Sequence, residues 1–223
     1  MDAPKKYPSS ELRLRLLKKA SEIISEKGIK KLTMRSLADK IGVSRTASYR
    51  HFENKDALLL AIAEEGFKTL TTRYQKINHD KSLDSLSKLQ NIGIAYIEFA
   101  IKNPGAFRLM FGQEIIQHQR SEKLCSAAKE TFDEYLKAVK TYQEEKKITI
   151  VDYSILANYF WTIIHGLTVL LIDGQIQITG DDYGLPTLLS NQRPNIMGDI
   201  QSMMAFSKQT IMNFWEVILN GVS

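Results

Sequence analysis

The stretch TMRSLADKIGVSRTASYRHF, residues 33–52, holds two short helical segments on either side of a tight turn. A threonine and a serine stand where each helix needs a cap, so the pattern predicts helices over Thr33–Lys40 and Ser44–Phe52. Gly42 in the turn is available for a backbone conformation that most residues avoid. These dimensions are those of a helix-turn-helix, in which the first helix braces a second that can enter the major groove of DNA.

The second predicted helix presents a face suited to nucleic acid. Its outward side chains are donors and acceptors for base edges and phosphates: Arg45, Thr46, Ser48, Tyr49 and Arg50. Lys55, at the start of the following helix, combines a cation with the free N–H groups of a helix N-terminus. We therefore expect this part of the chain to bind nucleic acid, with Lys55 on a phosphate.

Positive charge is concentrated in the same region. The 223-residue chain has a net charge of +5, but residues 1–60 alone hold 14 Lys and Arg against 7 Asp and Glu. The remainder is slightly acidic, which suggests a polyanion-binding module joined to a part that binds no polyanion. Charge alone leaves open the alternative that these residues are simply solvated faces of helices.

The rest of the chain also has helical periodicity. Outside the first motif the pattern predicts a first helix, capped by Ser9 or Ser10, that ends at Gly28, and another, capped by Asn54, that extends to about Ile77. It predicts further helices over Ser82–Asn103, a short one through Phe107–Phe111, Gln119–Lys146, Val151–Ile172 and Asp199–Asn220. Residues 174–198 read as a long loop, and no alternating pattern is long enough to predict a strand. The expected fold is all-α, with a three-helix DNA-binding domain over residues 1–56 and a larger helical domain over residues 57–223.

The uncharged run Tyr153–Ile172 is long enough to cross a membrane. Asn158, Thr162 and His165 interrupt it, and aspartates flank it where Lys or Arg would anchor a membrane span. A helix buried on several sides, in a core or a dimer interface, explains the same pattern, and we expect no membrane association.

Features of enzymes are missing from the sequence. The four histidines lack metal-ligand spacing, and there is no glycine-rich phosphate loop or nucleophile elbow. Cys125, the single cysteine, excludes an internal disulfide and is expected to be buried. No secretory signal pattern opens the chain. We predict a cytoplasmic protein that is not an enzyme and needs no cofactor or metal.

Residues 33–59 resemble the DNA-binding domain of TetR-type transcriptional regulators. The most specific features are the Gly-Val-Ser turn at 42–44, Tyr49-x-His51-Phe52 and the following Lys55-x-x-Leu58. The resemblance implies an all-helical homodimer whose N-terminal domains read the two halves of a near-palindromic operator in double-stranded DNA. It also implies a larger C-terminal domain that binds a small molecule.

The resemblance assigns roles by position. Thr33 and Arg35 would touch the DNA backbone, Arg45 and Thr46 would face bases, and Tyr49, His51 and Lys55 would grip phosphates. Ser48 departs from the family pattern, which more often has Leu or Pro there, so its contacts stay open. The full set of expected DNA-binding residues is Thr33, Arg35, Ser44, Arg45, Thr46, Ser48, Tyr49, Arg50, His51 and Lys55.

Two further stretches, Asn103–Gly112 and Trp161-x-x-x-His165-Gly166, are similar to the C-terminal domain class named for its Trp-His-Gly motif. The last two long helices of such regulators pair with their copies in a partner subunit. The residues expected at that interface are Trp161, His165, Gly166, Val169, Phe206, Ile211 and Phe214. The residues expected to line a largely apolar effector site, which an ordinary core would also contain, are Tyr96, Phe99, Phe107, Met110, Phe111, Tyr159 and Ile163.

These observations together favour a dimeric DNA-binding regulator, most simply a repressor that a small molecule releases from its operator. One alternative is constitutive DNA binding, with a C-terminal domain used only for dimerisation or protein interaction. A second is a small-molecule enzyme that carries the basic domain incidentally.

Overall fold

The first helix, α1 (Ser9–Lys27), places six apolar side chains on one face, where all six are buried: Leu12, Leu16, Leu17, Ala20, Ile23 and Ile24. This spacing of three and four residues forms one continuous stripe along a helix.

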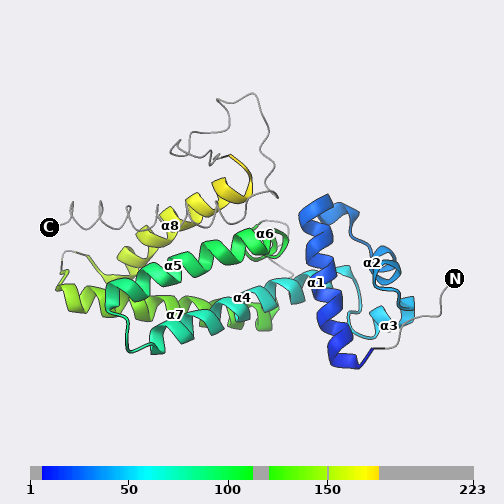
Figure 1. Ribbon diagram of the computed structural model, residues 1–223, viewed down its shortest axis with the longest axis horizontal. Helices are drawn as coiled ribbons and strands as arrows, with labels where there is room; N and C mark the ends of the chain where they lie inside the picture. The colour runs from blue at the N-terminus through cyan, green and yellow to red at the C-terminus, as the bar shows by residue number, and fades with distance from the viewer. Residues whose placement is uncertain (1–6, 113–120, 150, 176–223) are drawn as a thin grey trace. The chain divides into compact units, whose positions relative to one another are not determined.

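The computed structural model describes residues 7–112, 121–149 and 151–175. Within them every regular element is helical, which confirms the all-α fold (Figure 1).

The elements that follow α1 are a short 3-10 turn, η1 (Ile29–Lys31), and then α2 (Met34–Ile41), α3 (Arg45–Tyr49), α4 (Lys55–His79), α5 (Ser85–Lys102), α6 (Pro104–Phe111), α7 (Glu122–Lys146) and α8 (Tyr153–Ile172). The loop and the last helix predicted after residue 175 lie outside the described residues.

The described residues form two compact units, and each unit is built from two separate stretches of the chain. The N-terminal unit holds the described residues up to Thr69 together with those between Asn103 and Lys129. The C-terminal unit holds Leu70–Lys102 and the described residues from Glu130 onward. The sequence thus passes from one unit to the other within α4 and α7, and between α5 and α6.

The helix ends show where local sequence signals operate. Asn54 caps α4 by accepting a hydrogen bond from the Ala57 backbone N–H at 2.8 Å, as predicted. The predicted serine cap of α1 is wrong, because the helix begins at Ser9 after Pro8 and has no side-chain cap. The start of α5 also differs. Asp80 draws Ser82 into a turn, and the helix begins at Ser85.

In the N-terminal unit, α6 packs directly on α1. Gly105 is the point of closest approach, because a Cβ atom there would lie 2.6 Å from the Ser21 carbonyl oxygen of α1. The Gly105 backbone N–H donates to Ser25 Oγ at 2.8 Å. On the same short helix, the Phe107 and Phe111 rings contact each other at a tilt of 48° with centroids 4.9 Å apart, and Phe111 meets Phe67 of α4 edge-on at 5.5 Å. These contacts make α6 part of the unit that carries the helix-turn-helix.

In the C-terminal unit, α8 buries only one face. Its buried residues are Ala157, Phe160, Ile164, Thr168, Leu171 and Ile172, which recur at helical spacing. Large apolar side chains on other faces are exposed, including Ile155 at 58% and Tyr159 at 54%. Among the described helices α8 is also long and apolar enough to cross a membrane, a test that core helices of soluble proteins pass as well. The sequence predicted that α8 would be buried on several sides, but within one chain this helix buries only one face.

Candidate nucleic-acid interface

The turn between α2 and α3 has the geometry that its sequence predicts. Gly42 adopts a left-handed conformation, with φ 78° and ψ 33°, and its N–H donates to the Ala38 carbonyl at 3.0 Å. Side chains with a Cβ rarely adopt this conformation, so glycine is needed here. Val43 next to it is buried and donates its N–H to the same Ala38 carbonyl. The turn is therefore fixed by backbone bonds and one apolar anchor.

Two side-chain caps set the start of the paired helices. Thr33 forms a reciprocal capping box with Ser36, whose backbone N–H lies 3.0 Å from Thr33 Oγ1. Ser44 Oγ accepts from the Ala47 N–H at 3.2 Å. Thr33 and Ser44 were both predicted to touch DNA. Their side-chain oxygens instead serve first as caps, although both residues remain exposed.

The recognition helix α3 is shorter than predicted. It ends at Tyr49, because the N–H groups of His51 and Phe52 both turn back to the Ser48 carbonyl at 3.1 Å and close the chain into a turn. Phe52 is then drawn into the core and is only 4% exposed.

The exposed face of α3 carries most of the expected set. Arg45, Thr46, Tyr49 and Arg50 are all exposed, and Tyr49 exposes 51% of its surface. Arg35 on α2 is also exposed, with Asp39 4.0 Å away in a solvated ion pair. Such an exposed pair contributes little stability and leaves the guanidinium available to a phosphate. His51 is half-buried beside Phe52, with ring centroids 6.5 Å apart.

The prediction that Ser48 lies on the exposed face is wrong. Ser48 is fully buried, and its hydroxyl donates to the Arg45 carbonyl at 2.8 Å. It occupies the inner face of α3, at the position where the family pattern more often has an apolar residue. The hydroxyl is tolerated there because the backbone of the same helix satisfies it. In this position the Ser48 side chain is bonded within α3 and is not part of its exposed face.

Lys55 has a structural partner in addition to its predicted role. Its Nζ atom donates to the Ile29 carbonyl at 2.6 Å, which ties the first turn of α4 to η1. An ammonium group has three donors, so two N–H groups remain for a phosphate. Lys55 thus lies at a helix N-terminus with its position already fixed by the fold.

In the C-terminal unit the Trp-x-x-x-His spacing brings two rings together on α8. The Trp161 and His165 rings stack with centroids 5.0 Å apart and an interplanar angle of 30°. Tyr96 of α5 completes the group, with its hydroxyl 2.7 Å from His165 Nδ1. Burial lowers the pKa of His165 and raises that of Tyr96 well above its usual value, so both side chains are neutral at pH 7.

The residues predicted to line an effector site are divided between the two units. Tyr96 and Phe99 are buried on α5, and Ile163 is half-buried on α8. Tyr159 lies on the outer face of α8 and does not line the interior of this unit. The other three belong to α6 and therefore to the N-terminal unit: Phe107, Met110 and Phe111.

The predicted interface residues that the structure describes all lie on α8. Trp161, His165 and Val169 are half-buried, and Gly166 is exposed with no atom within 4 Å of the Cβ position that a substitution would fill. The remaining three, Phe206, Ile211 and Phe214, lie outside the described residues.

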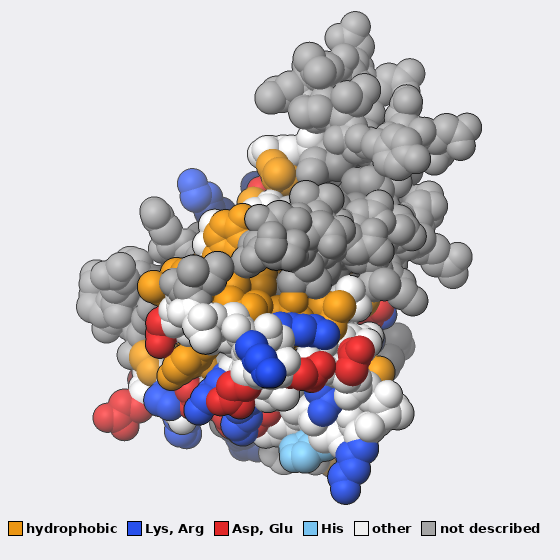
Figure 2. Space-filling model, turned by 90° about the vertical axis from the view of Figure 1, so that its left-hand side faces the viewer, with side chains coloured by type: hydrophobic (Ala, Val, Ile, Leu, Met, Phe, Trp, Pro, Cys, Tyr) orange, Lys and Arg blue, Asp and Glu red, His pale blue; other side chains and the backbone are white. Residues whose placement is uncertain are grey.

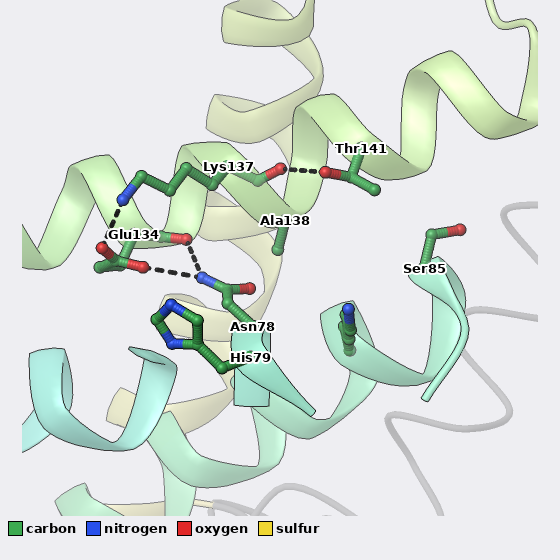
Figure 3. Close-up of a pocket in the computed structure, with 8 residues that line it drawn as sticks. Asn78, His79, Ser85, Glu134, Lys137, Ala138 and Thr141 are labelled. Carbon is green, nitrogen blue, oxygen red and sulfur yellow. Dashed lines mark hydrogen bonds and ion pairs between the residues drawn. The ribbon is translucent and has the colours of Figure 1, made fainter. Parts of the chain in front are cut away.

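A pocket of about 330 Å³ lies between the end of α4, the start of α5 and α7 (Figure 3). It is lined by Asn78, His79, Ser85, Lys88, Glu134, Lys137, Ala138 and Thr141, none of which was predicted as a ligand contact. Glu134 accepts from Asn78 Nδ2 at 2.9 Å and from Lys137 Nζ at 2.6 Å. Burial raises the pKa of Glu134, but these two bonds outweigh it and leave the pKa below its usual value. This carboxylate thus joins α4 to α7.

Two further expectations concern reactive side chains. Among the described residues no group of three His, Cys, Asp or Glu side chains could hold a metal ion. Cys125 is exposed, not buried as predicted. It lies in the first turns of α7 next to Leu124, which takes the inward position instead.

Comparisons with known proteins agree with the geometry of the N-terminal unit. Residues 16–62 match the family described as bacterial regulatory proteins, tetR family, and residues 89–185 match a tetracyclin repressor-like C-terminal domain. The chain is 32% identical over 133 residues to the nucleoid occlusion factor SlmA of Alteromonas mediterranea, an alignment that covers 57% of this chain and 67% of that protein.

Solved structures share the fold at lower identity. A protein of unknown function from Rhodococcus sp. RHA1 has a TM-score of 0.69 and 24% identity, covering 96% of this chain and 98% of that one. The TetR family transcriptional regulator PfmR of Thermus thermophilus has a TM-score of 0.62 and 17% identity, covering 89% of this chain and 97% of that one. With the helix-turn-helix geometry, these matches show that the chain belongs to the TetR family of DNA-binding bacterial regulators.

Proposed function

We propose that this protein is a dimeric repressor that binds a near-palindromic operator and is released from it by a small, largely apolar molecule. The observation that carries the proposal is the division of the chain into units. Helix α5 belongs to the C-terminal unit, whereas α6, which follows it after Asn103, belongs to the N-terminal unit. A ligand that shifts α5 would therefore act on the DNA-binding unit through the chain itself.

The contact between α6 and α1 supports this route. Gly105 leaves no space between the two helices, and its bond to Ser25 fixes their register. Tightly packed elements have few alternative arrangements, so displacement of one displaces the other. A change in the spacing of the two recognition helices from about 34–36 Å would lower the affinity for both half-sites together.

The outer face of α8 supports a homodimer. Ile155, Tyr159, Gly166 and Leu170 are exposed along this helix at spacings of four, seven and four residues. Figure 2 shows hydrophobic side chains gathered across the middle of one face of the molecule, with charged ones below them. A second copy of the chain would bury such a stripe, and a two-fold axis brings the same residues together from both subunits.

The chemistry of the buried side chains supports an apolar effector. Tyr96 and Phe99 supply aromatic surface on α5, and the Tyr96–His165 pair offers a polar contact to orient a bound molecule. A protein that binds operator DNA in a bacterial cell would act in the cytoplasm, and we include that localisation in the proposal.

A second candidate function follows from the relative at 32% identity, which is named a nucleoid occlusion factor. Under this alternative the chain acts while bound to DNA, and its C-terminal part serves only for dimerisation or for binding other proteins. This alternative predicts DNA binding that no small molecule releases.

The test begins with the purified full-length protein and a screen of apolar and aromatic compounds for a rise in melting temperature. Each compound that stabilises the protein is then titrated into a complex with the selected operator. Our proposal predicts that at least one stabilising compound weakens operator binding, while compounds without an effect on melting leave it unchanged. If every stabilising compound leaves the operator affinity unchanged, the release mechanism is wrong and constitutive binding is favoured.

A further inference from the structure

Arg13, in the second turn of α1, contacts the end of the recognition helix. Its guanidinium carbon lies 5.5 Å from the centroid of the Phe52 ring, which follows α3 after two turn residues. Phe52 is buried at 4% exposure, whereas Arg13 is half-buried. The guanidinium therefore covers the ring from the solvent side, in a contact typical of cation–π pairs.

The charge of Arg13 has no counterion among the described residues, where none of the ion pairs involves it. The neighbouring Arg15 gives a useful contrast. It pairs with Glu11 at 2.8 Å and lies 4.5 Å from the centroid of the Tyr7 ring. Of these two arginines on one helix, only Arg15 is paired with a counterion among the residues that the structure describes.

The length of α3 determines which part of the DNA lies next to Arg13 in a complex. At about 1.5 Å per residue, a five-residue helix extends only about 7.5 Å, less than the roughly 12 Å width of the major groove. A long side chain just beyond the end of so short a helix is therefore within reach of the sugar–phosphate backbone that borders the groove. Arg13 is held beyond the C-terminal end of α3, beside Phe52.

We propose that Arg13 is a DNA phosphate contact, held in place by the Phe52 ring. Stacking on an apolar ring fixes the planar guanidinium and leaves its in-plane N–H donors for a phosphate, a geometry that lysine cannot reproduce. The contact would be independent of base sequence and would add to those from α3 and α4. This inference rests on DNA binding by the helix-turn-helix and not on release by a ligand.

The test measures binding of the full chain to a mixed-sequence duplex over a series of salt concentrations. Each phosphate neutralised contributes about −0.9 to the slope of log K against log salt concentration. Arg13→Met keeps the aliphatic packing on Phe52 and removes the charge, and we expect its slope to be shallower by about 0.9. Arg13→Lys keeps the charge and should keep the slope. Arg13→Gln serves in place of Arg13→Met if that variant does not fold, as judged by circular dichroism.

The matched control is the double variant Glu11→Gln/Arg15→Met, which removes an ion pair from the same helix without changing the net charge. Its slope should equal that of the wild type. A wild-type slope in Arg13→Met, or in Arg13→Gln where that variant takes its place, would overturn the proposal and leave Arg13 as a packing residue only. An equal loss of slope in the control would also overturn it, because the effect would then belong to α1 in general. Absence of any salt-dependent binding by the wild type would instead contradict DNA binding itself.

Discussion

The hydroxyl of Tyr96 on α5 lies 2.7 Å from Nδ1 of His165 on α8, which joins two helices of the C-terminal unit through a buried polar contact. The Trp161 side chain also hydrogen-bonds Tyr96, and because an indole N–H can only donate, the tyrosine hydroxyl is left to donate to His165. Neutral His165 then carries its proton on Nε2. The four-residue spacing of Trp161 and His165 along α8 is explained by this contact, because one turn of helix brings both side chains to the same tyrosine.

This pair predicts how stability depends on pH. Burial lowers the pKa of His165 from its usual 6.5, so the unfolded chain binds this proton more readily than the folded one. The contribution of neutral His165 is therefore complete above pH 6.5 and is lost as the pH falls below it. We expect urea unfolding to show lower stability at about pH 5.5 than at about pH 7.5.

The variant His165→Gln should lose most of this pH dependence between the two conditions. The carboxyl groups with lowered pKa values, such as Asp80 and Asp84, titrate at lower pH and do not account for it. An unchanged pH dependence in His165→Gln would show that another group is responsible.

The packing of α6 on α1 predicts that alanine in place of Gly105 lowers the stability of the protein, which is the opposite of its usual effect in a helix. Alanine normally stabilises a helix by up to about 1 kcal/mol relative to glycine. At Gly105, however, the added Cβ would lie 2.6 Å from the Ser21 carbonyl oxygen and 2.7 Å from Ser25 Oγ. We expect Gly105→Ala to lower the free energy of unfolding by about 1–3 kcal/mol, as measured by urea denaturation.

A second variant separates the two clashes. Adding Ser25→Ala removes the Oγ atom but leaves the Ser21 backbone, so the double variant should recover only part of the loss. A Gly105→Ala protein as stable as the wild type would mean that α6 is not held against α1 as described.

Neighbouring residues on α3 should respond differently to the same substitution. Tyr49→Ala removes an exposed side chain of the recognition face and should weaken binding to all duplexes by a similar factor, about 1 kcal/mol. Ser48→Ala removes a buried hydroxyl bonded to the Arg45 carbonyl. It should cost stability of the same order and leave DNA affinity nearly unchanged. Fluorescence anisotropy and thermal melting separate the two effects, and a large loss of affinity in Ser48→Ala alone would reverse our assignment.

The exposed face of α8 predicts the effect of a charge at Gly166. No atom lies within 4 Å of the Cβ position there, so Gly166→Glu should not disturb the fold of a single chain. In a dimer built on this face the glutamate would be buried against its own copy, where two like charges repel. We expect light scattering to give the mass of a monomer for Gly166→Glu and that of a dimer for Lys123→Glu, a charge change on the exposed start of α7. A dimer in both would place the interface elsewhere.

The sequence predicted the features that depend on near neighbours. Thr33, Ser44 and Asn54 cap their helices, and Gly42 forms the turn, because each of these interactions spans three or four residues. The TetR family and the all-α fold were likewise predicted from these motifs, and both are confirmed.

Features set by distant contacts could not be predicted in the same way. Ser48 and Phe52 are both buried by packing against other elements, and Arg13 meets the Phe52 ring from another helix. Cys125 faces outward because Leu124 takes the inward position, a choice that helical periodicity left open. The grouping of α6 with α1 depends on a close approach at Gly105 that no local pattern marks.

The most direct test of a sequence-specific dimeric regulator is selection from a pool of random duplex DNA by the purified full-length protein, at physiological salt, followed by sequencing. We predict recovery of a near-palindromic sequence with half-sites about one helical turn apart, because two copies of α3 related by a two-fold axis would read it. Recovery of no common sequence, together with weak and strongly salt-dependent binding, would contradict this account and leave only non-specific attraction of the basic N-terminal region to DNA.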